Sequence, residues 1–304
     1  MTALGGWMIA DLAARLGVPD TRPVASPLRL ATDWDGQRLE TASGPCFVKK
    51  LRAGQGAVID VAAVAEASAL AGAIGIAPRL LAADADRGLL VFEALDEADW
   101  HWSCIDDLID ERLSPLLGAM KAFHAAGTLS VRRDIFADIA ALRALAAGAG
   151  ANLPHDAVWL GQCVDLIGIA MAAAGSDAVP VRADGAASNV LRCRDGGVLL
   201  VDFDRAGMGD PWLDVAVVLN ELFQFEEEWQ AALELWAGRC HPAEYARVRL
   251  YAMADDMYWG LWGLWNAALH RGQGIEFFKY GQWRLLRLRQ SLSDARFEAW
   301  LRRV

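Results

Sequence analysis

The stretch that decides the fold is 181-VRADGAASNVL-191, taken together with 201-VDFDRAGMGDP-211. The first stretch places Asp184 and Asn189 in a loop of small residues that leads into an apolar segment. The second places Asp202 and Asp204 at the end of another apolar run. Turns that follow strands are often built from Asp and Asn, so each residue alone is an ordinary turn residue. Their joint spacing favours a second interpretation, in which these polar groups are brought together for chemistry.

The sequence before this region predicts a small antiparallel sheet with one helix. Residues 28–51 form short alternating runs that are punctuated by Gly36 and by Ser43-Gly44. Residues 60–75 have helical spacing and strong helix formers. Two further strands are expected at 79–84 and 88–95, around a turn.

After about residue 98 the sequence becomes mainly helical. One helix is expected over 113–127, two more within 134–177, and further helices from 212 onward. Residues 189–193 and 197–203 are predicted to pair as a hairpin, which carries the polar groups described above. The chain is therefore expected to form two lobes, 1–95 and 96–304.

Composition excludes several classes of protein. The chain has 304 residues, of which 55% are hydrophobic and 22% charged, which is typical of a globular protein with a large core. A net charge of −10 argues against a nucleic-acid partner and is compatible with a cationic substrate. Five cysteines without a CxxC pair fit reduced thiols in a cytoplasmic protein. We expect no signal peptide, because the N-terminus has amphipathic helical spacing, and no apolar segment long enough to span a membrane.

The D-x4-N loop, the following hydrophobic-D-F-D segment and the preceding strand–helix–strand pattern resemble the aminoglycoside phosphotransferase and choline kinase family. The resemblance extends from about Leu28 to Arg289. It implies an α+β, bilobal, protein-kinase-like fold with a small antiparallel β-sheet lobe and a larger, mainly helical lobe. It also implies that residues 1–95 bind the nucleotide and that 96–304 hold the catalytic residues and the acceptor. The cofactors implied are ATP and Mg²⁺.

The resemblance assigns roles to the central polar residues. Asp184 would be the catalytic base, and Asn189 and Asp202 would bind the metal. This fits the chemistry, because phosphoryl transfer depends on positioning and on neutralising charge. Magnesium prefers oxygen ligands and shares its coordination sphere with phosphates.

The nucleotide would be held by residues of the first lobe. Lys49 and Glu66 are expected to pair and to clamp the phosphates, and the Glu93 carbonyl and the Leu95 N–H to bind the adenine edge. Because side chains alternate across a strand, only one of Lys49 and Lys50 can face the nucleotide.

Three features depart from the family pattern. Arg182 replaces the histidine that precedes the catalytic aspartate, and an arginine there can brace the loop but brings a fixed charge. The loop lacks the common His-Pro-Gly insert. Asp33 and Asp35 flank the expected phosphate loop, where carboxylates repel a triphosphate. These departures keep open a different class of function, a degenerate kinase-like binding protein without transfer activity.

The C-terminal helices suggest the acceptor. Asp255, Trp259 and Trp262 follow helical spacing, which places a carboxylate and two indoles on one face. Such a face binds ammonium groups, as in a choline- or ethanolamine-like acceptor, although packing of a Trp-rich helix produces the same stripe. Glu221 and Asp204 are further candidates for substrate contact. An aminoglycoside or sugar-like acceptor is the alternative, and the oligomeric state stays open.

Overall fold

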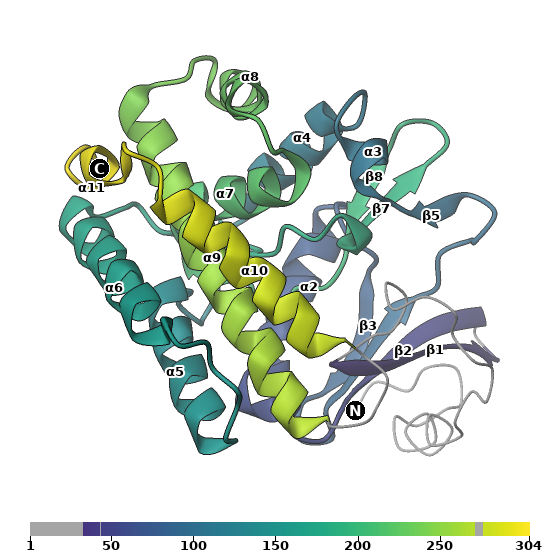
Figure 1. The fold of residues 1–304 in the computed structure, drawn as a ribbon. Helices are drawn as coiled ribbons and strands as arrows, with labels where there is room; N and C mark the ends of the chain where they lie inside the picture. Colours follow the sequence, from purple (N-terminus) through teal and green to yellow (C-terminus); the bar gives the residue numbers. More distant parts are fainter. Residues whose placement is uncertain (1–32, 43, 271–275) are drawn as a thin grey trace. The chain divides into compact units, whose positions relative to one another are not determined.

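The computed structural model describes residues 33–42, 44–270 and 276–304. The amphipathic helix predicted at the N-terminus and most of the first predicted strand lie outside these residues. The chain divides into two compact units (Figure 1). Unit 1 comprises the described residues up to Arg133 together with Ala178–Met208, and unit 2 comprises Asp134–Asp177 and Gly209–Val304. These units do not follow the division predicted at residue 95.

Unit 1 contains the predicted antiparallel sheet. Its strands run in the order β1-β2-β4-β3 and are β1 (Trp34–Thr41), β2 (Gly44–Leu51), β4 (Leu89–Glu93) and β3 (Leu80–Asp84). Helix α2 (Val61–Ala73) begins at Asp60, whose carboxylate accepts from two backbone N–H groups of its first turn. A short 3-10 turn, η2 (Gln55–Ala57), precedes it. The small β lobe with one helix is therefore confirmed.

The remainder of unit 1 explains why the unit extends past residue 95. It contains α3 (Ile105–Leu108) and α4 (Leu113–His124), a three-stranded sheet and a two-stranded sheet. The three-stranded sheet joins β5 (Trp100–Trp102) to the predicted hairpin β7 (Val190–Cys193) and β8 (Val198–Leu200). The other sheet pairs β6 (Val179–Val181) with β9 (Gly207–Gly209), and η3 (Ala187–Asn189) precedes β7. The Leu200 N–H also donates to the Ile76 carbonyl at 2.8 Å, which ties the hairpin to the segment after α2.

Unit 2 is helical and is built around one long helix, α9 (Pro242–Leu269). Against it pack α5 (Ile135–Gly148), α6 (Ala157–Ala174), α7 (Pro211–Leu222), α10 (Phe277–Leu292) and α11 (Phe297–Leu301), and α8 (Glu226–Ala237) follows α7. Glycines allow α9 and α10 to approach closely, since a Cβ on Gly263 would lie 2.8 Å from the Gly281 Cα. Asp210 accepts from the Trp212 N–H at 3.0 Å and caps α7.

Helix α6 is the element that bears on the expectation of no membrane-spanning segment. Within the described residues it is the one helix whose length and composition would allow it to cross a membrane, with a mean hydropathy of 1.6 over 18 residues. A single such helix is weak evidence for a membrane span. Its Asp165 forms an ion pair with Arg143 of α5 at 2.8 Å.

Candidate active site

The loop that carries Asp184 is braced by Arg182, as the sequence suggested for this departure from the family. Arg182 is buried, and its guanidinium donates to the carbonyls of Asn189 (3.1 Å), Val201 (2.9 Å) and Asp184 (2.5 Å). One side chain therefore holds both ends of the D-x4-N loop and the residue before Asp202. The planar fork of arginine can serve three carbonyls in this way, which a lysine ammonium cannot match in geometry.

Asp184 is a buried carboxylate with directed hydrogen bonds. Its Oδ1 accepts from the Ala186 N–H at 2.8 Å, and its Oδ2 accepts from Asn189 Nδ2 at 2.6 Å. Burial raises the pKa of Asp184 above its ordinary value, and the nearby Arg182 charge offsets part of that rise. A carboxylate that is more basic than usual is suited to accept a proton from a substrate.

Asp202 joins this loop to the sheet. Its Oδ1 lies 2.7 Å from Lys49 Nζ, and its Oδ2 lies 3.4 Å from Asn189 Nδ2. Burial alone would raise the pKa of Asp202, but the Lys49 ammonium more than compensates and holds that pKa below its ordinary value. Its backbone φ of +65° lies in the left-handed region, which costs a non-glycine residue about 1 kcal/mol or more. Such strain is typical of functional positions.

Asp204 is held by a residue that the sequence analysis missed. The Trp34 indole N–H donates to Asp204 Oδ2 at 2.7 Å, and Lys49 Nζ lies 4.9 Å from the centroid of the Trp34 ring. The other oxygen, Asp204 Oδ1, is buried and receives no hydrogen bond from the described residues. Burial and the neighbouring Asp202 charge raise the pKa of Asp204 well above its ordinary value.

These oxygens fit a nucleotide-bound magnesium. In the described part of the chain, no three His, Cys, Asp or Glu side chains are grouped so that they could hold a metal ion. Magnesium in kinase sites is held by one or two carboxylates and completes its shell with phosphate and water oxygens. Asp202, Asn189 and the undonated oxygen of Asp204 supply such a partial set, and the Asp202 side chain keeps 31% of its surface exposed.

The predicted Lys49–Glu66 pair is replaced by other contacts. The Glu66 carboxylate accepts from the Ser130 N–H at 3.0 Å and from the Ser130 hydroxyl at 2.5 Å. Lys49 pairs with Asp202 instead. Helix α2 is thus tied to the segment after α4, because Ser130 offers two donors to one carboxylate.

The predicted adenine-binding segment lies at the end of β4. The Glu93 carboxylate accepts from the backbone and side chain of Arg79, at 2.9 and 2.8 Å. The Leu95 carbonyl accepts from Arg38 Nη1 at 2.9 Å. The Glu93 carbonyl and the Leu95 N–H, which were assigned to adenine, keep that assignment as a prediction.

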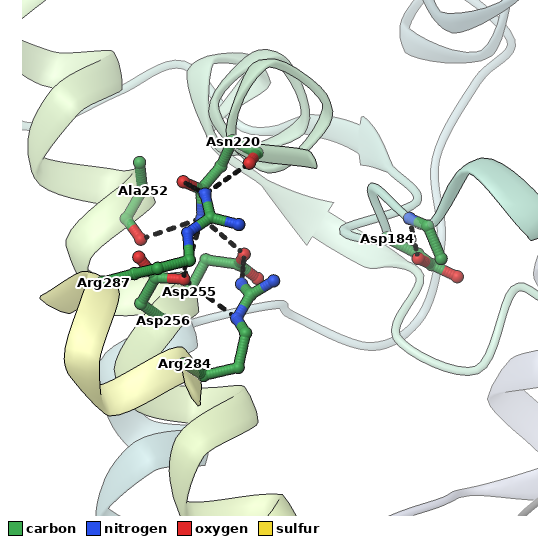
Figure 2. Close-up of polar contacts among 8 residues, drawn as sticks. Asp184, Asn220, Ala252, Asp255, Asp256, Arg284 and Arg287 are labelled. Carbon is green, nitrogen blue, oxygen red and sulfur yellow. Dashed lines mark hydrogen bonds and ion pairs between the residues drawn. The ribbon is translucent and has the colours of Figure 1, made fainter. Parts of the chain in front are cut away.

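In unit 2, Asp255 belongs to a buried network. Asp255 pairs with Arg284 of α10, and the neighbouring Asp256 lies 2.9 Å from Arg284 Nε (Figure 2). Asn220 Nδ2 lies 3.1 Å from Asp255 and 3.2 Å from Asp256, and Arg287 donates to Asn220. The charge of Asp255 is therefore compensated inside the protein, which weakens its predicted role as a partner for an ammonium group.

The two predicted indoles lie in an aromatic cluster of α9 and α10. Trp259 and Trp262 pack edge to face at 5.3 Å between centroids, and Tyr280 lies 6.5 Å from the first and 6.2 Å from the second. Trp262 is buried, whereas Trp259 is half-buried. Burial raises the pKa of Tyr280, and the charges of Asp255 and, to a lesser extent, Glu221 on α7 add to that rise. Glu221 is therefore within electrostatic reach of this cluster.

Comparison with known proteins gives the family. The model of the phosphotransferase enzyme family matches residues 28–251, and a search of curated proteins by sequence finds no match. A choline/ethanolamine kinase family protein from Mesorhizobium loti has a TM-score of 0.74 at 21% identity, over 97% of this chain and 99% of that one. Choline kinase LicA from Streptococcus pneumoniae has a TM-score of 0.74 at 18% identity, over 85% and 89%.

More distant structures include antibiotic kinases. A spectinomycin phosphotransferase has a TM-score of 0.57 at 13% identity, over 83% of this chain and 85% of that one. These likenesses confirm the α+β, kinase-like fold expected from the sequence. The family match covers the sheet that carries Lys49 and the loop and hairpin that carry Asp184, Asn189 and Asp202. The chain belongs to the phosphotransferase enzyme family.

Proposed function

We propose that the protein transfers the γ-phosphoryl group of ATP, with Mg²⁺, to a hydroxyl of a small, amine-bearing acceptor. The observation that carries the proposal is the unbroken chain of contacts Lys49–Asp202–Asn189–Asp184 in unit 1. It supplies a cation for phosphate, oxygen ligands for a metal and a basic carboxylate in one connected group. The likeness to LicA solved with AMP, with a TM-score of 0.72, further supports an adenine nucleotide.

Each residue then has a part in the transfer. The acceptor oxygen forms a bond to the γ-phosphorus while the bond from that phosphorus to the β–γ bridging oxygen breaks, and ADP leaves with the electron pair. Asp184 takes the hydroxyl proton. Asn189, Asp202 and Asp204 would hold Mg²⁺, which neutralises the phosphate charge when bound. Arg182 keeps the Asp184 loop in place through its three carbonyl contacts.

The proposed acceptor carries an ammonium group, like choline or ethanolamine. An aromatic cluster with a carboxylate within electrostatic reach is a common means of binding such a cation. Since Asp255 is paired with Arg284, we assign the role of that carboxylate to Glu221, whose charge acts on Tyr280 of this cluster. A phosphotransferase for an aminoglycoside or sugar-like acceptor is the second candidate, which the likeness to the spectinomycin enzyme favours.

An ATP-consumption screen tests the proposal. Choline, ethanolamine, thiamine, aminoglycosides and amino sugars are offered as acceptors, with Asp184→Asn and Asp202→Ala as controls. We expect turnover with one amine-bearing class and none with either variant, at an unchanged melting temperature for Asp184→Asn. A melting temperature that rises with Mg-ATP but no turnover with any acceptor would favour the non-catalytic binding protein.

A pair of tryptophan variants tests the acceptor site. Trp262→Leu removes a ring of the aromatic cluster, and Trp300→Leu removes a comparably buried indole elsewhere in unit 2. Both should lower the melting temperature. Only Trp262→Leu should raise the acceptor KM, by about 2- to 30-fold, because cation–π contacts contribute roughly 0.5–2 kcal/mol. An acceptor KM unchanged in Trp262→Leu would leave these indoles as core and remove the argument for a cationic acceptor.

A further inference from the structure

Trp34 stands at a junction between the core of unit 1 and its catalytic residues. It is the first residue of β1 and is 2% exposed. Its ring packs in a cluster of buried apolar residues, with Ile59, Val61, Val64 and Leu90. A buried indole N–H needs an acceptor. Here the acceptor is the Asp204 carboxylate, 170 positions away in the sequence.

The strand register places the same ring beside Lys49. In the β1–β2 pair Trp34 lies opposite Leu51, and Leu51 is two residues from Lys49 on β2. Paired residues and alternate residues of a sheet share one face, so Trp34 and Lys49 lie on the same side. The 4.9 Å distance from Lys49 Nζ to the ring centroid is within the range of a cation–π contact.

We propose that Trp34 is a positioning residue for the metal and phosphate site, a role that rests on the function proposed above. Its N–H fixes one oxygen of Asp204, and the other, buried oxygen receives no donor from the described residues and is left to a cation. Its ring supports the Lys49 ammonium. Donors behind a metal-binding carboxylate typically change metal affinity by about 10- to 100-fold when they are removed. Trp34 therefore acts through Asp204 and Lys49, and contacts neither substrate nor metal in this role.

The test measures direct binding of Mn²⁺ in the presence of ADP. The electron paramagnetic resonance signal of free Mn²⁺ reports how much of the ion stays unbound. Trp34→Phe keeps an aromatic ring in the core and removes the donor. We expect its Mn²⁺ dissociation constant to rise about 10-fold. Trp229→Phe is the matched control, because Trp229 is also 2% exposed and its N–H also makes one bond, to the Phe223 carbonyl at 3.2 Å. This control should lose similar stability and keep wild-type Mn²⁺ affinity.

The double variant tests whether Trp34 acts through Asp204. In an Asp204→Ala background, adding Trp34→Phe should change the Mn²⁺ affinity by less than about 2-fold, because the shared contact is already gone. A further full tenfold loss would show independent action and overturn the proposal. Should Trp34→Phe fail to fold, Asp204→Ala tests the same contact from the acceptor side, and unchanged Mn²⁺ affinity in that variant would overturn it as well.

The outcomes distinguish a failure of the proposed function from a failure of the role of Trp34. Absence of Mn²⁺–ADP binding by the wild-type protein would overturn the proposed function, and the role of Trp34 with it. Wild-type binding with equal affinity in Trp34→Phe would overturn only the role of Trp34. An equal loss in Trp34→Phe and in Trp229→Phe would have the same consequence, since it would trace the effect to stability.

Discussion

Replacing Lys49 by Met, with Lys50→Met as its control, separates the catalytic role of one lysine from a general effect of charge. The two residues are neighbours on β2 and point to opposite faces of the sheet. Lys49 lies opposite Leu90 and reaches Asp202 at 2.7 Å, whereas Lys50 lies opposite Leu89 and Asp35. Both substitutions remove one positive charge from the same strand.

The effect of Lys49→Met on stability is expected to be small. At 2.7 Å and an effective dielectric constant of about 20, the gross attraction between the two charges is about 6 kcal/mol. The side chains are 17% and 31% exposed, so solvent screening and the cost of desolvating both groups offset most of that attraction. The net change in the free energy of unfolding should therefore be within about 1–2 kcal/mol.

The effect on catalysis is expected to be much larger. A fixed cation at the phosphates is worth most as charge develops in the transition state, and removing one such group typically lowers kcat by about 100- to 1000-fold. A coupled assay of ADP release, nucleotide binding by isothermal titration and a thermal melt on both variants measure the three quantities. Lys50→Met should stay within about 2-fold of wild type. An equal loss in Lys50→Met, or near-normal turnover in Lys49→Met, would refute the assignment of faces.

Three further predictions concern the charged groups around the site and in unit 2. Arg284→Met should lower the free energy of unfolding, measured by urea denaturation, by about 3–5 kcal/mol, because it leaves two buried carboxylates with too little positive charge. Arg302→Met is the exposed control and should change that free energy by under about 0.5 kcal/mol. Burial raises the pKa of Asp256 from 3.8 to about 6, so the folded state favours the neutral form of this carboxyl group. The free energy of unfolding should therefore fall by about 1 kcal/mol from pH 5 to pH 7. Asp256→Asn should remove this pH dependence of the free energy of unfolding. Arg182→Lys keeps the charge but loses the three-carbonyl geometry, so kcat should fall at least about 10-fold while nucleotide affinity is retained; unchanged kcat would show that the loop holds its shape without the guanidinium.

Local patterns in the sequence predicted the elements whose contacts join residues that are near one another in the sequence. Alternation and turn residues were enough for the β3–β4 and β7–β8 hairpins, and helix formers after Asp60 were enough for α2. Asp184, Asn189 and Asp202 come together because one hairpin and its two flanking loops carry all three. The strand β5 was missed because three residues are too few to show a period.

Contacts between distant segments could not be read in the same way. Glu66 was given to Lys49 because both positions fit, yet Ser130 offers two donors and takes the carboxylate. Asp255 was predicted to be a carboxylate beside two indoles, but in the structure it forms an ion pair with Arg284. A signal for that pair was present, since Arg284 stands among apolar residues at helical spacing on α10 and is buried at 3% exposure. A buried arginine requires a buried carboxylate, but spacing alone does not say which one.

The charges in unit 1 bear on the acidic residues that flank the expected phosphate loop. Asp35 pairs with Arg52 at 2.8 Å, so one of the two carboxylates that flank this loop is compensated. Burial alone would lower the pKa of Lys49, but the charges of Asp202, Asp204 and Asp33 together raise it above its ordinary value. Asp33, Asp202 and Asp204 all act on this ammonium, and each of them that is ionised would repel an added triphosphate. A divalent cation reverses that balance, because it is attracted by the same carboxylates and by the phosphates at once. On the proposed function, we infer that these acidic surroundings would favour a nucleotide that binds together with its metal.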